Sequence, residues 1–357
     1  MGPTSIKRIN IVPLNIPLEA PFKIAIGIKN SIQNVLVTIQ LENGMEGYGE
    51  AAPLEPINGE NQATAMATIK SCEEFLIGED VRHYKEISVK LKSVFWAQAA
   101  ARCAIEMAII DAYTKTLNVP LYQFFGGAQR TIETDFTIGI VSAETAKNSA
   151  TNLAQRGYHT IKTKVGNHID EDIARILAIK EGAPKCEIMI DANQGYSTQE
   201  ALQFLEKLKE NKVTPALFEQ PVLKHDLEGM RFIKNNTSIP IAADETVFTS
   251  ADATAVAKSE CADLINIKLM KSGIVEALEI AAIARKSNIR LMIGCMLETK
   301  LGLGCAAHFA AGLGGFEFVD LDPHLYPDAD PFIGGPDFVE PFYNFSATEV
   351  GIGITIK

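Results

Sequence analysis

Polar residues that could carry chemistry recur at regular spacing in the second half of the chain. Each ends a short apolar run, and successive members lie roughly 25 residues apart, about the length of one βα unit. The members are Lys164, Asp191, Glu219, Asp244, Lys268, Cys295 and Asp320. The three consecutive carboxylates would repel one another unless a cation neutralised them, and all-oxygen ligands suit Mg²⁺ better than zinc. We therefore predict one Mg²⁺ per subunit on Asp191, Glu219 and Asp244, although each alone would equally fit a helix N-cap.

A lysine pair stands at the first of these positions. Lys162 and Lys164 are two residues apart, so on a strand their side chains leave the same face, and Ile161 and Thr163 take the other. Two neighbouring ammonium groups lower each other's proton affinity, which makes a lysine a usable base. An isolated lysine pair is more often a solvated surface feature, and Lys268 carries the same ambiguity. The fold has to decide between these interpretations.

An aspartate pair ends the last apolar run. Asp320 and Asp322 are again two residues apart, so on a strand they share a face and could bind a cation together. A turn or a helix cap is an equally common role for such a pair. The six histidines show no metal-ligand spacing, and we assign them to packing or to the surface.

A (β/α) barrel would bring these residues together. From about residue 131, eight short apolar runs alternate with amphipathic helices, as is typical of this fold. The carboxyl ends of barrel strands converge on one mouth, where strands 2 and 6 face each other across the axis. Lys164 and Lys268 would then approach a bound carbon from opposite sides. If one lysine removes a proton beside a carboxylate and the other returns it to the opposite face, the product is an epimer, and a metal ion would stabilise the enolate between the two steps.

The first third of the chain has a different pattern. Residues 33–41 and 45–51 are typical of two strands joined by a turn, and residues 97–117 have the apolar spacing of a helix. The last residues are strand-like. We predict an α/β protein with a (β/α)7β TIM-like barrel over 131–324, an α+β N-terminal capping domain over 1–130, and a C-terminal segment, 325–357, that returns to complete the capping domain.

The composition excludes several classes of partner. Lys and Arg number 33 against 44 Asp and Glu, which gives a formal net charge of −11 and argues against binding to nucleic acid or to an anionic membrane. No run of about 18 apolar residues is present to span a bilayer. The first ten residues lack the apolar core of a signal peptide, and six scattered cysteines without a CxxC favour a reducing cytoplasm.

In the candidate lysines and carboxylates and in the motifs around them, the chain resembles the enolase superfamily, in its muconate-lactonizing subgroup, and most closely the dipeptide epimerases. The resemblance covers nearly the whole length. The matching motifs are GYGEAAP (47–53), PLYQFFGG (120–127), KTK (162–164), DANQG (191–195), EQP (219–221), ADET (243–246), INIKLMKSG (265–273) and DLD (320–322). A lysine or histidine base with Mg²⁺ is a general property of that superfamily.

The resemblance implies a role for each candidate residue. Lys164 and Lys268 would be the two acid and base catalysts, and Lys162 would assist the substrate carboxylate. The free ammonium group of a small dipeptide substrate would bind Asp320 and Asp322. The remaining substrate-binding positions would be Thr137, Met296 and Glu298. Loops of the capping domain near residues 20–30 and 52–60 would close over the substrate.

The predicted specificity loop, PFKIAIGIK (21–29), departs from the family pattern. Epimerases that act on L-Ala-L-Glu usually place an arginine about where Ile26 or Gly27 stands, whereas Ile24 and Ile26 make this loop apolar. An apolar pocket favours a hydrophobic substrate residue. Two lysines in the loop could still bind a glutamate, so an L-Ala-D/L-Glu epimerase stays an alternative.

The sequence thus predicts a Mg²⁺-dependent epimerase that inverts the α-carbon of the C-terminal residue of hydrophobic dipeptides. Three other activities of the subgroup stay open: a cycloisomerase, an o-succinylbenzoate synthase and an N-acylamino acid racemase. Their substrates carry no free ammonium for the DLD motif. A peptide-binding barrel without activity is the alternative from another class, although a decayed enzyme should have lost at least one candidate residue. The sequence leaves open whether the chain forms a homo-oligomer.

Overall fold

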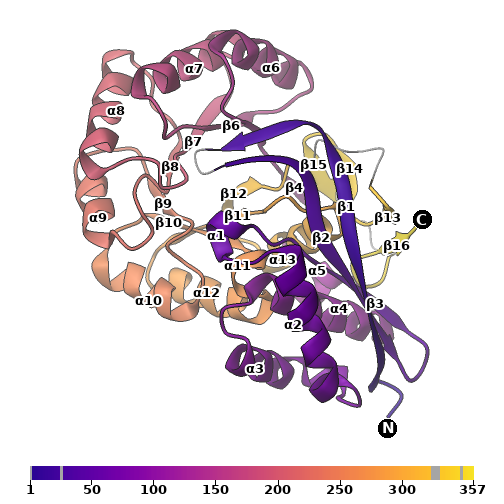
Figure 1. Ribbon diagram of the computed structural model, residues 1–357. Helices are drawn as coiled ribbons and strands as arrows, with labels where there is room; N and C mark the ends of the chain where they lie inside the picture. The colour runs from indigo at the N-terminus through magenta and orange to yellow at the C-terminus, as the bar shows by residue number, and fades with distance from the viewer. Residues whose placement is uncertain (1, 25–26, 323–329, 346–348) are drawn as a thin grey trace.

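The barrel is a sheet of eight parallel strands in the order β5 to β12 (Figure 1). A computed structural model describes residues 2–24, 27–322, 330–345 and 349–357, without the side chains of residues 19–29. The barrel strands are β5 (Phe136–Ile138), β6 (Thr160–Lys164), β7 (Glu187–Asp191), β8 (Leu217–Glu219), β9 (Ile241–Ala243), β10 (Leu264–Lys268), β11 (Arg290–Gly294) and β12 (Phe316–Asp320). The predicted eight runs are therefore confirmed as strands of one barrel.

Helices follow the strands and cover the outside of the sheet, where α6 to α10 and α12 form an arc in Figure 1. They are α6 (Ala143–Gln155), α7 (Ile169–Gly182), α8 (Thr198–Glu210), α9 (Leu227–Asn235), α10 (Ser250–Ser259), α11 (Leu269–Ser272), α12 (Ile274–Lys286) and α13 (Lys300–Leu313). Ser197 and Thr249 begin α8 and α10 with capping boxes, which satisfy N–H groups that a helix start leaves unpaired. Among the helices described, none has the length and hydrophobicity of a membrane span.

An apolar layer fills the barrel interior beneath its carboxyl end. It takes one side chain from each of six successive strands: Met189, Leu217, Ala242, Leu264, Met292 and Phe318. The sheet is nearly closed, because Asp135 N–H donates to Val319 O (3.0 Å) where β5 meets β12. The barrel is therefore a packed core, and the polar strand ends stand above an apolar floor.

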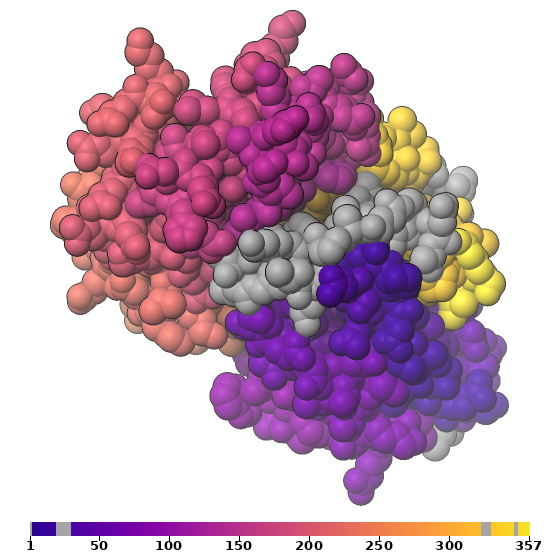
Figure 2. Space-filling view, turned by 45° about the horizontal axis from the view of Figure 1, so that its top comes forward, coloured from indigo at the N-terminus to yellow at the C-terminus, as the bar shows by residue number. Residues whose placement is uncertain are grey.

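The capping domain is built on a three-stranded antiparallel sheet, β1-β2-β3. Its elements are β1 (Ile6–Ile24), β2 (Gly27–Leu41), β3 (Glu46–Ala51), α1 (Glu55–Asn58), α2 (Gln62–Leu76), the 3₁₀ helix η1 (Val81–His83), α3 (Tyr84–Val94), α4 (Ala99–Thr116) and α5 (Leu121–Phe124). The predicted hairpin and helix are confirmed, although β2 begins earlier than residue 33. In Figure 2 this domain, in indigo, forms one lobe beside the magenta and orange barrel.

The GYGEAAP motif explains how the capping sheet packs on α4. A Cβ atom at Gly47 would lie 2.0 Å from Ala108 O, and one at Gly49 would lie 2.0 Å from Ala104 O. Only glycine therefore allows the backbones of β3 and α4 to approach this closely. The motif is a packing requirement at this point of the fold.

Two carboxylates of the capping domain bind the N-termini of barrel helices. Glu50, on β3, accepts hydrogen bonds from Thr299 Oγ1 (2.6 Å) and Gly302 N (2.9 Å) at the start of α13. Glu106, on α4, accepts one from Ile274 N (2.6 Å) at the start of α12. Helix N-termini offer unpaired N–H groups and a partial positive charge, so each contact joins the two domains.

The C-terminal segment returns to the capping domain, as predicted. It forms β13 (Phe332–Gly334), β14 (Asp337–Val339), β15 (Phe342–Asn344) and β16 (Ile354–Ile356), and β15 pairs with β4 (Thr131–Glu133). Leu121 N donates to Gly351 O (2.8 Å), and Ile352 N donates to Asp111 Oδ1 (2.8 Å). The domain boundaries at 130 and 324 stay predictions.

His308 is buried in α13 where the barrel, α5 and the C-terminal segment meet. Its Nδ1 accepts a hydrogen bond from Tyr122 N (3.0 Å), so its Nε2 carries the hydrogen and donates to Ile352 O (3.1 Å). Burial lowers the pKa of His308 to about 4. The folded protein therefore holds this ring neutral.

We expect His308 to contribute to unfolding in acid. An unfolded histidine binds a proton near pH 6.5, whereas the folded one does so only near pH 4, so its share of the unfolding free energy is present above pH 6.5 and falls by about 3 kcal/mol toward pH 4. Urea unfolding of wild type and His308→Gln at several pH values measures this share as the difference in their pH dependence. Parallel curves for the two proteins would contradict it.

Candidate active site

Three buried carboxylates meet at the carboxyl end of the barrel. Asp191 ends β7, Glu219 ends β8 and Asp244 directly follows β9. Parallel pairing places Asp191 beside Glu219, and each of the three offers one oxygen within 4.8 Å of the others. An all-oxygen set of this kind fits a divalent cation, so the sequence prediction that these residues converge is correct.

The carboxyl groups of the triad differ in pKa, because burial, neighbouring carboxylates and lysines act on each to a different extent. Burial, and then the charge of Asp191, raises the pKa of Glu219 to about 7. Burial acts in the same direction on Asp191, but the ammonium groups of Lys164 and Lys162 outweigh it and lower the pKa of Asp191 to about 2. Nearby positive charge therefore decides which carboxyl is ionised.

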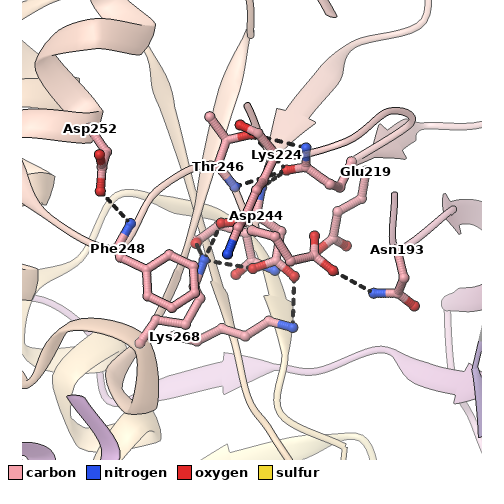
Figure 3. A network of polar contacts seen from close by, with 12 residues as sticks. Asn193, Glu219, Lys224, Asp244, Thr246, Phe248, Asp252 and Lys268 are labelled. Carbon is pink, nitrogen blue, oxygen red and sulfur yellow. Dashed lines mark hydrogen bonds and ion pairs between the residues drawn. The ribbon is translucent and has the colours of Figure 1, made fainter. Parts of the chain in front are cut away.

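The two predicted catalytic lysines contact opposite members of the carboxylate triad. Lys164 Nζ lies 2.6 Å from Asp191 Oδ2. On the other side, Lys268 Nζ lies 2.8 Å from Asp244 Oδ2, and Figure 3 shows Lys268 reaching toward Asp244. Both lysines are nearly buried. Burial acts to lower the pKa of Lys268, but the carboxylates of Asp244 and Glu219 outweigh it and raise the pKa above its usual value.

Lys162 connects the triad to the aspartate pair. Its fully buried Nζ lies 2.6 Å from Glu219 Oε2, 3.2 Å from Asp191 Oδ2 and 2.7 Å from Asp320 Oδ2. Burial acts to lower the pKa of Lys162, but the surrounding carboxylates raise it well above its usual value. From the sequence we expect the ammonium group of Lys164 to lower the pKa of Lys162. Carboxylates outweigh that effect, because three of them lie within 3.2 Å of Lys162 Nζ.

Thr137 and the aspartate pair lie next to Lys162 at the end of the barrel. Thr137 N donates to Asp322 Oδ2 (3.0 Å), and Thr137 Oγ1 lies 3.3 Å from Asp320 Oδ1. Both aspartates are buried. The structure therefore brings these predicted substrate-binding residues into one cluster, although they come from opposite ends of the barrel sequence.

The other predicted substrate residues lie on the loop after β11 and in the capping domain. Met296 N donates to Glu298 Oε1 (2.8 Å), and Glu298 is buried before α13. In the predicted specificity loop, Ile26 and the side chain of Ile24 lie outside what the structure describes, and Gly27 is described only as the first backbone position of β2. Their contribution to substrate choice stays a prediction.

Four further polar residues support the triad, and the sequence prediction missed them. Asn266 Nδ2 donates to Glu219 Oε1 (2.7 Å), Lys271 Nζ lies 2.6 Å from Asp244 Oδ1, and Asn193 N donates to Asp191 Oδ1 (2.8 Å). The fourth, Glu245, accepts a hydrogen bond from Asn193 Nδ2 (3.2 Å). Asn266 could have been found, because it stands two residues before Lys268 and so shares its strand face. Lys271 lies on the short helix α11, where strand alternation gives no signal.

Comparison with known proteins places this site in a family. Residues 144–357 match the enolase C-terminal domain-like family, and residues 6–126 match the mandelate racemase / muconate lactonizing enzyme N-terminal domain. An L-Ala-D/L-amino acid epimerase of Populus trichocarpa is 41% identical over 96% of this chain and 82% of its own. An aromatic dipeptide epimerase of Herpetosiphon aurantiacus is 40% identical over 93% of this chain and 94% of its own.

Solved structures agree with these sequence matches. A dipeptide epimerase of Enterococcus faecalis, solved with Mg and the dipeptide L-Leu-L-Tyr, superposes with a TM-score of 0.94 at 34% identity, over 98% of this chain and 99% of that one. The chain belongs to the mandelate racemase / muconate lactonizing enzyme family of the enolase superfamily. Its relatives over nearly the full length are dipeptide epimerases, which are isomerases, so the predicted superfamily and enzyme group are confirmed.

We expect Glu219→Gln to weaken Mg²⁺ binding by about 100-fold or more, because the variant removes a buried anionic ligand. Isothermal titration of metal-free protein with Mg²⁺ measures the change. Glu187→Gln is the matched control, since Glu187 is exposed at the other end of the barrel on the neighbouring strand β7. Equal affinities of the two variants would contradict the metal site.

Proposed function

We propose that this protein is a Mg²⁺-dependent dipeptide epimerase that inverts the α-carbon of the C-terminal residue. The observation that carries this proposal is the pairing of Lys164 with Asp191 and of Lys268 with Asp244, which puts one lysine on each side of a single carboxylate cluster. Two bases on opposite sides of one carbon are what inversion by proton transfer requires.

In this proposal the carboxylate triad holds one Mg²⁺ per subunit. The donor set of three buried carboxylates supports this assignment, as does the magnesium in the related Enterococcus structure. When bound, the ion supplies positive charge that stabilises the substrate carboxylate as the α-proton leaves. Asn266 and Lys271 keep two of the triad side chains in place through their hydrogen bonds.

The two lysines divide the proton transfer between them. One, as a neutral amine, accepts the α-proton when the Cα–H bond breaks, and the other, as an ammonium, gives a proton to the opposite face of the same carbon. The reverse reaction exchanges these roles, so Lys164 and Lys268 each serve one configuration of the substrate. No oxidant or reductant is consumed, because one C–H bond replaces another.

The aspartate pair provides the site for the amino terminus of the dipeptide. Asp320 and Asp322 are buried carboxylates at the barrel end, and an ammonium group has three N–H donors to offer them. Thr137 binds both aspartates and holds them at the seam of the barrel. A substrate held by its ammonium there and by its carboxylate at the metal presents its second α-carbon to the lysines.

Hydrophobic dipeptides are the proposed substrates. A groove between the capping domain and the loop after β11 has a mixed lining of apolar and polar residues: Ser31, Ile32, Gln33, Asn34, Pro53, Leu54, Glu55, Asn61, Gln62 and Leu297. The one charged residue among these ten is acidic, Glu55, so the groove offers a glutamate side chain repulsion and no cationic partner. The apolar sequence of the specificity loop points to the same substrate class.

We expect each catalytic lysine to act on one configuration. Lys164→Ala and Lys268→Ala should each lose epimerisation by about 10³-fold, yet one should still exchange the α-hydrogen of the L form of the second residue in D₂O, and the other that of the D form. Mass spectrometry of both epimers measures the exchange. Lys258→Ala, on the exposed side of α10, is the control and should act as wild type. Loss of both exchanges in both variants would contradict the division of roles.

We also expect a preference for apolar second residues. The wild-type kcat/KM for L-Leu-L-Tyr should exceed that for L-Ala-L-Glu by about tenfold or more, since the glutamate would be desolvated without a cationic partner. A panel of dipeptides followed by chiral chromatography measures this ratio. A higher value for L-Ala-L-Glu would favour the alternative epimerase, and no exchange with any dipeptide would favour the other activities of the subgroup.

A further inference from the structure

Asp135 lies at the seam of the barrel, directly before β5. Its backbone N–H binds Val319 O of β12, so the residue is held between the first and last strands. Asp135 and Thr137 are two residues apart on an extended backbone, so their side chains leave the same face. Since Thr137 contacts Asp320 and Asp322, Asp135 shares the face that carries the aspartate pair.

The side chain of Asp135 is buried without a donor. Only 3% of the residue is exposed, and among the described residues no hydrogen-bond donor reaches either carboxyl oxygen. An ionised carboxylate is strongly unfavourable in such surroundings. Burial, followed by the charges of Asp320 and Asp322, raises the pKa of Asp135 well above its usual value, although Lys162 opposes this. A buried carboxyl group that receives no hydrogen bond and lies near other carboxylates is favoured in its neutral, protonated form.

A neutral carboxyl group has one O–H to donate, and the nearest carboxylate on this face is that of Asp320, which directly follows Val319 and contacts Thr137. Asp320 already receives Lys162 Nζ (2.7 Å) on Oδ2 and Thr137 Oγ1 (3.3 Å) on Oδ1. A third donor fixes the orientation of this carboxylate. Without this third hydrogen bond, the ion pair with Lys162 would be the dominant restraint on Asp320. That ion pair would draw the Asp320 carboxylate away from an ammonium group at the mouth of the barrel.

We propose that Asp135 is a positioning residue for the amino terminus of the substrate: by donating a hydrogen bond to Asp320, it keeps that carboxylate directed at the dipeptide ammonium. This inference rests on the proposed function, which places the ammonium on Asp320 and Asp322. It follows that Asp135 sets how strongly the enzyme prefers a free amino terminus to an N-acylated one, because an acylated nitrogen has no charge for Asp320 to bind.

Two substitutions at Asp135 separate this role from simple packing. Asp135→Val keeps a similar shape but has no donor, whereas Asp135→Asn keeps an N–H that can reach Asp320. The substrates are L-Leu-L-Tyr and its N-acetyl derivative, and kcat and KM are measured for both. We expect Asp135→Val to raise KM for the free dipeptide about tenfold while kcat and the reaction of the acetylated substrate change less than about threefold. Asp135→Asn should restore most of the wild-type preference.

A control and a binding measurement complete the test. Thr163→Val is the control: it removes a buried hydroxyl that has no hydrogen-bond partner among the described residues, on the other face of the neighbouring strand β6, and it should alter the kinetics of neither substrate. Calorimetric titration with the same two dipeptides gives the preference as a ratio of Kd values without turnover.

Three outcomes would overturn the inference, and they differ from one another. If Asp135→Val keeps the wild-type preference for the free amino terminus, Asp135 does not position Asp320. If Asp135→Asn loses that preference as fully as Asp135→Val, the hydrogen bond is not its basis. A wild type that neither binds nor epimerises either dipeptide contradicts the proposed function and the inference with it.

Discussion

Buried carboxylates that share one end of a barrel must also share cations, and this constraint governs the arrangement around the strand ends. Lys164 and Lys268 each pair with one member of the triad, and Lys271 adds a second cation to Asp244. Lys162 pairs with two members of the triad and with Asp320. The lysines are thus structural counterions as well as candidate catalysts. Any divalent ion in the triad has to be accommodated within this balance of charge.

The same constraint explains why the site occupies several strands. One strand end can direct only one or two side chains into the barrel mouth, because alternation sends the next residue outward. Asp191, Glu219 and Asp244 therefore come from three neighbouring strands, and the apolar layer beneath them keeps water from screening their charges. The polar cluster and the dry floor depend on one alternating pattern.

Much of this arrangement could be predicted from the sequence, because a βα unit has a nearly constant length. The regular recurrence of strand ends was enough to predict the barrel, the triad and the positions of Lys164 and Lys268. The reach of a side chain across the barrel was not predictable. Lys162 has the same alternation as Lys164 but is fully buried among carboxylates, and no periodicity indicates that. The environment of Asp135 likewise arises only when the first and last strands meet.

The carboxylates of Glu50 and Glu106 have a mechanical consequence. Each belongs to the capping domain and is buried, yet each completes the first turn of a barrel helix. Rotating the two domains apart would leave both charges and several helix N–H groups without partners, at a cost of several kcal/mol. These two carboxylates therefore resist rotation of the capping domain away from the barrel and hold it over the strand ends.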